Sequence, residues 1–120
     1  MRFYYNCSLI IPTFKRVLDL HNCLKSIDNS NFEFKEIIIV VRDNDYDTIN
    51  FLKQTSHDFH LVSKPGQIEA IKVGLNKASG EIVGFIDDDT EVNDEWLTSA
   101  MTHFKDPSVG AVGGRDFQPN

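Results

Sequence analysis

Basic side chains are scarce in this sequence. Twelve Lys and Arg residues stand against eighteen Asp and Glu residues in a chain of 120, which gives a formal net charge of −6, and the basic residues form no cluster. Non-specific attachment to nucleic acid or to an anionic lipid surface requires clustered Lys and Arg. We therefore expect no nucleic-acid partner.

Long apolar runs are also missing, and cysteine is rare. No stretch approaches the ~20 apolar residues of a membrane-spanning helix, so no transmembrane segment is expected. The opening letters "MRFYYNCSLIIP" are apolar but short, lack a small-residue cleavage site and end at Pro12. They indicate a first strand rather than a signal peptide. Cys7 and Cys23 lie in apolar patterns, which favours buried, reduced thiols in a cytosolic protein over a disulfide or a metal site.

Length and patterning fit a single domain over residues 1–120, because the chain is long enough for one ordinary domain and too short for two. Strand-like apolar runs and helix-like spacing alternate along the chain. Such alternation, with near-continuous apolar strands, predicts an α/β fold with a mostly parallel sheet and helices on both faces. Strands are expected at residues 7–14, 36–41, 59–63, 81–86 and 109–114, and helices at 17–27, 46–55, 68–78 and, capped by Asn93, 94–104.

In such sheets, ligands bind beyond the carboxyl ends of the strands. The polar residues at those ends are Thr13, Asp43, Lys64 and the consecutive acids Asp87, Asp88 and Asp89. They are therefore the candidates for a binding site.

The three aspartates end the run "GEIVGFIDDDTEV", directly after a strand apolar enough to be central. In an extended chain Asp87 and Asp89 leave one side and Asp88 the other. Two like charges about 5 Å apart repel by roughly 3 kcal/mol at an effective dielectric near 20. Either water in an exposed loop or a divalent cation offsets that repulsion. The position favours Mg²⁺ or Mn²⁺, and because Mg²⁺ binds through few carboxylates together with substrate phosphates, it implies a nucleotide-bearing ligand.

Four segments carry a resemblance to a known family. "SLIIPTF", "EIIIVVRDNDYDT", "KPGQIEAIKVGLNKASGEIVGFIDDDTEVNDEWL" and "VGAVGGR" occur, from Ser8 to Arg115, in the order and spacing of family 2 glycosyltransferases. The resemblance implies a Rossmann-like GT-A sheet and inverting transfer of a sugar from a nucleotide diphosphate donor to an acceptor hydroxyl. It also implies a glycan or lipid-linked acceptor, and a cytoplasmic setting at the inner face of the membrane in polysaccharide assembly.

The resemblance also implies binding roles for several residues. A purely structural role is open for some of them. Thr13 can simply end a strand, Asp43 can cap the next helix, Lys64 can be solvated and Gly66 can serve a helix end. Trp96 is expected in the core. The implied nucleotide-sugar-binding residues are Pro12, Thr13, Phe14, Asp43, Lys64, Gly66, Asp87 and Asp88, and the implied metal ligands are Asp87 and Asp89, with Asp89 bonding the metal directly.

Two departures from the family pattern matter. Many relatives carry two acids after the second strand, whereas this chain has Arg42 followed by Asp43; the base contact then rests on Asp43, and the nucleotide is left open. Family members also continue well past the fifth strand, through the acceptor-binding half and the general base. We therefore expect the donor-binding half of a longer, here truncated, glycosyltransferase that has no catalytic base of its own and is inactive alone.

Three other functions compete with this interpretation. A phosphoacceptor receiver domain would place its paired acids after the first strand, where this chain has Pro12, Thr13 and Phe14. A nucleotidyltransferase would have a Gly-rich phosphate loop there, and none is present. A non-catalytic nucleotide-binding or interaction module built from the same half-fold is compatible with the sequence.

Overall fold

The computed structural model describes residues 2–114 and forms a layered α/β structure. Its strands and helices alternate, as the sequence pattern predicts. The elements are β1 (Phe3–Thr13), α1 (Val17–Asp28), β2 (Phe32–Arg42), α2 (Tyr46–Lys53), β3 (Phe59–Val62), α3 (Gln67–Lys77), β4 (Ile82–Phe85) and α4 (Trp96–His103).

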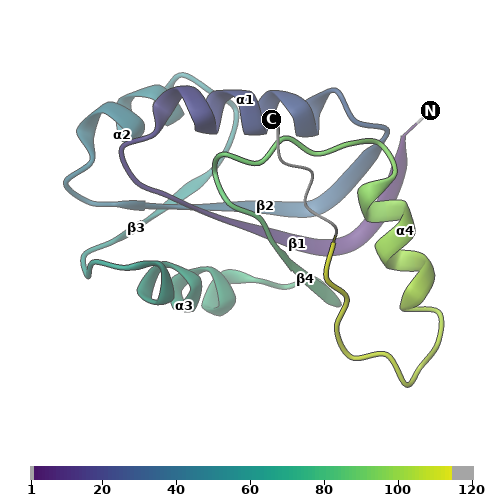
Figure 1. The fold of residues 1–120 in the computed structure, drawn as a ribbon. Coiled ribbons are helices and arrows are strands. Elements are labelled where there is room, and N and C mark those ends of the chain that lie inside the picture. Colours follow the sequence, from purple (N-terminus) through teal and green to yellow (C-terminus); the bar gives the residue numbers. More distant parts are fainter. Residues whose placement is uncertain (1, 115–120) are drawn as a thin grey trace, which may run out of the picture.

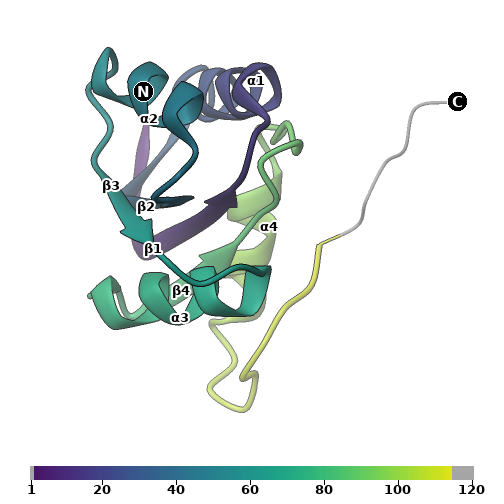
Figure 2. The ribbon, with the colours of Figure 1, turned by 90° about the vertical axis from the view of Figure 1, so that its left-hand side faces the viewer.

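The four strands form one sheet in the order β3-β2-β1-β4, and all of its pairings are parallel. Figures 1 and 2 show α1 and α2 on one face of this sheet and α3 on the other. The predicted parallel sheet with helices on both faces is therefore confirmed. Within residues 2–114, none of the helices has the length and apolar character needed to cross a membrane.

Two apolar layers hold the helices to the sheet. On one face, alternate residues of β1 and β2 such as Leu9 and Ile39 pack against α1 and α2, with Trp96 of α4 at the edge of the cluster. On the other face, their neighbours Ile10 and Ile38 pack against α3. Because successive strand residues point to opposite faces, strands buried on both sides are apolar throughout. This packing fixes the strand ends, from which the polar loops emerge.

The predicted fifth strand at residues 109–114 is wrong, since that segment has no strand pairing. Its composition "VGAVGG" explains the result, because glycine in a strand costs backbone entropy and offers no side chain to pack. Within residues 2–114, β4 consequently pairs only with β1 and lies at the edge of the sheet rather than at its centre. Arg115, which ends the last of the four segments that resemble the family, lies outside the described residues.

The start of α4 also differs from the expectation. The helix begins at Trp96, and Asn93 does not cap it. Instead, the Asn93 side-chain oxygen accepts a hydrogen bond from the Glu95 N–H at 3.0 Å, and the Asn93 carbonyl accepts one from the Trp96 N–H at 3.3 Å. Asn93 therefore forms a local turn that precedes the helix, a role in which short amide side chains are common.

The amino end of the sheet is held by a charged network around Glu36. Its Oε2 accepts hydrogen bonds from the Ser8 hydroxyl and from the N–H and hydroxyl of Ser79. These bonds hold the pKa of Glu36 below its ordinary value of 4.5. The network ties β1 and β2 to the loop after α3.

Replacing Glu36 with Gln is expected to destabilise the fold at pH 7 by about 1 kcal/mol, because a charged acceptor makes stronger hydrogen bonds than an amide. A carboxylate with a lowered native pKa stabilises above its unfolded value and loses this effect as pH falls through the native value. The difference from the wild type should thus shrink below pH 4.5. Urea unfolding from pH 3 to pH 7 measures it, and an equal difference at both ends would contradict the role of the charge.

Candidate functional site

A cleft of about 580 Å³ lies at the carboxyl ends of the strands. That volume is within the range of small-molecule sites in proteins. Each of the four strands contributes to it, directly or through the loop that follows. Its lining residues are Pro12, Thr13, Phe14, Arg16, Arg42, Val62, Pro65, Gly66, Gln67, Ala70, Asp87, Asp88 and Asp89.

The sheet topology accounts for the place of the cleft. After β1 the chain turns through α1 to its neighbour β2, whereas α3 carries the chain from β3 back across the other face to β4, on the far side of β1. The loops after β1 and β3 therefore lead to helices on opposite faces of the sheet (Figure 1). In open α/β sheets, such a switch in direction creates the crevice in which ligands bind.

Asp88 occupies the buried part of the aspartate cluster. It is only 6% exposed, and its Oδ2 accepts a hydrogen bond from the Thr13 hydroxyl at 2.9 Å. Burial raises the pKa of Asp88 above its ordinary value, and the Thr13 hydrogen bond and the Arg16 charge oppose that rise. The pair joins the loop after β4 to the end of β1, so the Thr13 hydroxyl is engaged within the protein.

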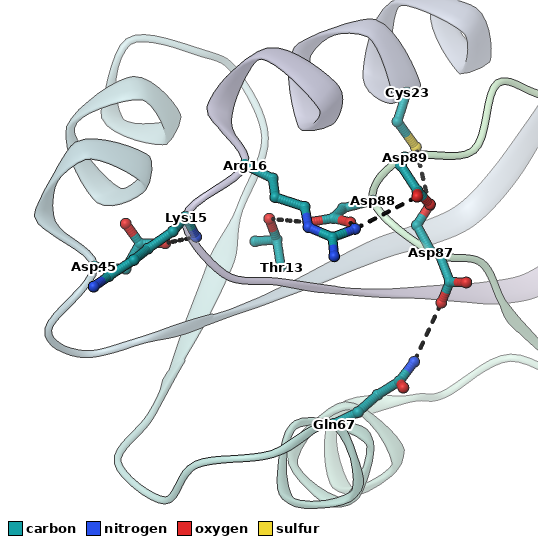
Figure 3. A network of polar contacts seen from close by, with 9 residues as sticks. All are labelled: Thr13, Lys15, Arg16, Cys23, Asp45, Gln67, Asp87, Asp88 and Asp89. Atoms are coloured by element: carbon teal, nitrogen blue, oxygen red, sulfur yellow. Dashed lines mark hydrogen bonds and ion pairs between the residues drawn. The ribbon is translucent and has the colours of Figure 1, made fainter.

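Arg16 bridges two of the acids. Its Nη1 lies 3.4 Å from Asp88 Oδ1 and 3.4 Å from Asp89 Oδ2, while Asp87 accepts a hydrogen bond from the Gln67 side chain at 3.2 Å (Figure 3). The sequence indicated that Asp87 and Asp89 would share one side. Instead Asp89 joins Asp88 at Arg16, because the chain leaves the extended conformation in a turn closed by the Thr90 N–H and the Asp87 carbonyl.

The carboxylates suit a divalent cation only if other ligands complete its shell. Asp87 and Asp89 are exposed and line the cleft. Among the described residues, no group of three or more His, Cys, Asp or Glu side chains is placed to hold a metal. Mg²⁺ commonly takes one or two carboxylates and fills its remaining positions with water and substrate phosphates. The donor set therefore fits a cation that arrives with a phosphorylated ligand, and not one enclosed by protein alone.

The opposite part of the cleft is aromatic and basic. The Phe14 side chain is 44% exposed. The Lys15 ammonium lies 5.1 Å and the Arg42 guanidinium carbon 5.6 Å from the centre of its ring. Both distances are within the range of cation–π attraction. From the sequence, Arg42 was notable only because many relatives carry an acidic residue at this position. In the structure its side chain lines the cleft.

Asp45 holds the loop that carries Phe14 and Lys15. It is 2% exposed, and its carboxylate accepts a hydrogen bond from the Lys15 N–H at 2.7 Å (Figure 3). It also accepts one from the Thr48 N–H at 3.4 Å. Lys15 has a φ of 54°, which a residue other than glycine rarely adopts. Asp45 thus holds the loop after β1 while it caps α2. Sequence reasoning missed this role, although an Asp three residues before Thr48 at a helix start is a capping signal.

Two of the predicted site residues are not among those that line the cleft. Asp43 and Lys64 are both exposed. The Asp43 N–H donates to the Val62 carbonyl at 3.0 Å, which continues the pairing of β2 with β3. The alternative role of Asp43 as a helix cap is wrong, because Asp45 caps α2.

Gly66 lines the cleft and also begins α3. Its φ of 101° and ψ of 152° lie in a region that only glycine adopts readily. A Cβ built at this position would meet no atom within 4 Å. The backbone conformation therefore explains the glycine without a ligand.

The cysteines are both free and buried, as predicted. Cys23 lies beneath the aspartates, with its Sγ 3.9 Å from the Asp87 carbonyl oxygen. Burial, reinforced by the charges of Asp88, Asp89 and Glu91, raises its pKa to about 12. The thiol stays protonated at neutral pH, so it is a poor nucleophile and a poor metal ligand.

The sequence of this chain is similar to that of a bacterial glucosyltransferase. Over 101 residues the chain is 34% identical to the GalNAc(5)-diNAcBac-PP-undecaprenol beta-1,3-glucosyltransferase of Campylobacter jejuni, covering 78% of this chain and 33% of that protein. The chain thus spans about a third of that relative's length.

Solved structures with the same fold include a mannosyltransferase and the S. aureus protein TarS. The mannosyltransferase PcManGT of Pyrobaculum calidifontis, in complex with GDP-Man and Mn²⁺, superposes with a TM-score of 0.76 at 22% identity, over 90% of this chain and 34% of that chain. TarS 1-349 of S. aureus, in complex with UDP-GlcNAc, gives a TM-score of 0.69 at 22% identity, over 99% of this chain and 37% of that chain. The fold is therefore that of the GT-A glycosyltransferases.

The family model described as Glycosyl transferase family 2 matches residues 8–119, nearly the whole chain. The matched region contains every residue that lines the cleft. This chain belongs to glycosyl transferase family 2.

Proposed function

We propose that this chain is the donor-binding part of an inverting glycosyltransferase. In this function a sugar passes from a nucleotide diphosphate-sugar to an acceptor hydroxyl, with Mg²⁺ or Mn²⁺ held by Asp87 and Asp89. One observation carries the proposal. The exposed carboxylates after β4 and the aromatic and basic residues after β1 and β2 line one cleft at the switch point of the sheet.

The charges of the cleft suit the two parts of such a donor. The acidic part, at Asp87 and Asp89, would hold the cation, which supplies positive charge opposite the departing diphosphate. Thr13 and Asp88 position this loop through their buried hydrogen bond. Arg16 lies beside Asp88 and Asp89 and is half exposed, so its guanidinium is within reach of a phosphate group placed there.

The relatives support the proposal by what their names say of them. The Pyrobaculum enzyme was captured with GDP-Man and Mn²⁺, and the S. aureus enzyme with UDP-GlcNAc. The name of the Campylobacter relative describes a lipid-linked acceptor. For the present protein we propose a glycan or lipid-linked acceptor, met at the cytoplasmic face of the membrane, and a catalytic base supplied from outside these residues.

The proposed donor-contacting residues remain those of the sequence prediction. Seven of them line the cleft. Asp43 and Lys64 follow or precede lining residues and are exposed, so each can reach a ligand from the rim. The seven are Pro12, Thr13, Phe14, Gly66, Asp87, Asp88 and Asp89.

Calorimetric titration with nucleoside diphosphates, in the presence and absence of Mn²⁺, tests the proposal. We expect saturable binding that requires the cation, because the diphosphate and the carboxylates repel each other without it. Absence of binding for every nucleotide tried, with and without Mn²⁺, would instead favour a non-catalytic interaction module.

Replacing Arg16 with Ala is expected to tighten the binding of Mn²⁺ alone by about two- to fivefold. The guanidinium competes with a cation for Asp88 and Asp89, and removing an exposed ion pair is worth less than about 1 kcal/mol. Arg2→Ala is the matched control, because Arg2 forms a similarly exposed pair with Glu33 at 3.7 Å. Equal Mn²⁺ affinity in the Arg16 variant and the wild type, measured by calorimetry, would count against this competition.

A further inference from the structure

Arg42 and Phe14 form one wall of the cleft on neighbouring strands. Arg42 ends β2 and Phe14 follows β1, and these strands pair directly, with Thr13 opposite Val41. The guanidinium carbon lies 5.6 Å from the centre of the Phe14 ring. Both residues line the cleft. A ligand in this part of the cleft therefore meets a flat aromatic ring and a flat cation together.

The side-chain N–H groups of Arg42 are not used within the described residues. Its Nε is buried without a hydrogen-bond partner, and the ion pairs among residues 2–114 do not include it. A guanidinium has five N–H donors and no acceptor. A buried donor without a partner destabilises the protein. A ligand that offers an acceptor to the guanidinium would remove this unfavourable free energy.

The order of the strands separates the wall formed by Phe14 and Arg42 from the aspartates after β4. Arg42 ends β2, whereas Phe14 follows β1 and Asp87 follows β4, and these three strands are consecutive in the sheet. Neighbouring strands lie about 4.8 Å apart, so the ends of β2 and β4 are separated by about 10 Å across the sheet. If the diphosphate lies at the aspartates, as the proposed function requires, the nucleoside extends toward Phe14 and Arg42.

We infer that Arg42 selects the nucleobase of the donor, with Phe14 as the surface against which the base packs. Since Arg only donates, it favours a base with two adjacent acceptors, such as N7 and O6 of guanine or O2 and N3 of cytosine. Adenine presents a donor beside N7, and uracil has an N–H between its two carbonyl oxygens. Arg42 is thereby a specificity-determining residue, and the inference rests on the proposed function.

The affinities of GDP, CDP, UDP and ADP in Mn²⁺, measured by calorimetry, test the inference. We expect GDP or CDP to bind about tenfold more tightly than UDP and ADP, the selectivity typical of one bidentate arginine contact. Arg42→Lys keeps the charge but loses the planar fork, so the preference should fall to about twofold, because the affinity for GDP or CDP falls more than the affinity for UDP or ADP. Phe14→Leu should weaken all four nucleotides alike.

The outcomes separate the inference from the function on which it rests. A preference for UDP or ADP, or a preference of about tenfold that persists in the folded Arg42→Lys protein, would overturn the role of Arg42 while leaving the donor site intact. Failure of all four nucleotides to bind would overturn the proposed function and the inference with it. Thermal unfolding of each variant, compared with the wild type, confirms that the protein measured is folded.

Discussion

Replacing Asp87 and Asp89 together with Asn is expected to weaken Mn²⁺-dependent binding of a nucleoside diphosphate at least about 100-fold. These two side chains supply the exposed carboxylates of the cleft, since Asp88 is buried against Thr13. Asn has the same shape but no charge, so it removes both the attraction for the cation and a preferred hard ligand. Even indirect disturbance of a metal site commonly costs 10- to 100-fold.

The matched control is the double change of Asp58 and Asp94 to Asn. Both residues are exposed and neither lines the cleft, so the net charge changes equally and the cleft does not. Calorimetry should show affinity near that of the wild type for this control. If both double variants bind equally well, or lose affinity equally, the metal ligands lie elsewhere or the effect is one of overall charge.

Replacing Gly80 with Ala is expected to destabilise the fold by about 3 kcal/mol. A Cβ at this position would lie 2.6 Å from the Ser8 backbone nitrogen and 3.0 Å from the Cys7 carbonyl carbon. Both atoms belong to the backbone of β1 at the centre of the sheet, which cannot move aside as a side-chain end can. Overpacking of this kind typically costs 1–3 kcal/mol or more. The Gly80 N–H also donates to the Ser8 hydroxyl at 2.8 Å, and the clash would strain that bond.

Gly110→Ala provides the comparison, because a Cβ there meets no atom within 4 Å. Urea unfolding of the two variants should give a large loss of stability for Gly80→Ala and a change of less than about 0.5 kcal/mol for Gly110→Ala. Similar stabilities would mean that the loop after α3 does not approach β1 as closely as the structure has it.

The parallel sheet was predictable because its signals are local. Runs such as "IIIVV" at residues 37–41 are apolar at every position, which only a strand covered on both faces requires. The helices between them follow from the spacing of Leu20, Leu24 and Ile27. The location of the cleft follows from the topology, since polar residues after parallel strands meet at one edge. The fifth strand failed because β-branched residues favour a strand only where a partner strand and a packing surface exist.

The details of the site depend on contacts that a sequence does not display. Arg16 reaches Asp88 across 72 residues of chain, and a long flexible side chain can pair with any acid in its range. The arrangement of the three aspartates was mispredicted because one turn at Asp87 changes the side to which each carboxylate points. The wall formed by Phe14 and Arg42 depends on the register between β1 and β2. The apolar pattern alone does not determine this register, because a shift by two residues keeps every side chain on the same face of the sheet.

Anomalous diffraction at the manganese edge, from crystals grown with Mn²⁺ and a nucleoside diphosphate, would locate the cation of the proposed donor site. We expect one strong peak in the cleft, bonded to a carboxylate of Asp87 or Asp89 and to diphosphate oxygens. Manganese bound elsewhere, or a nucleotide seated in the cleft with no metal beside the aspartates, would contradict this expectation.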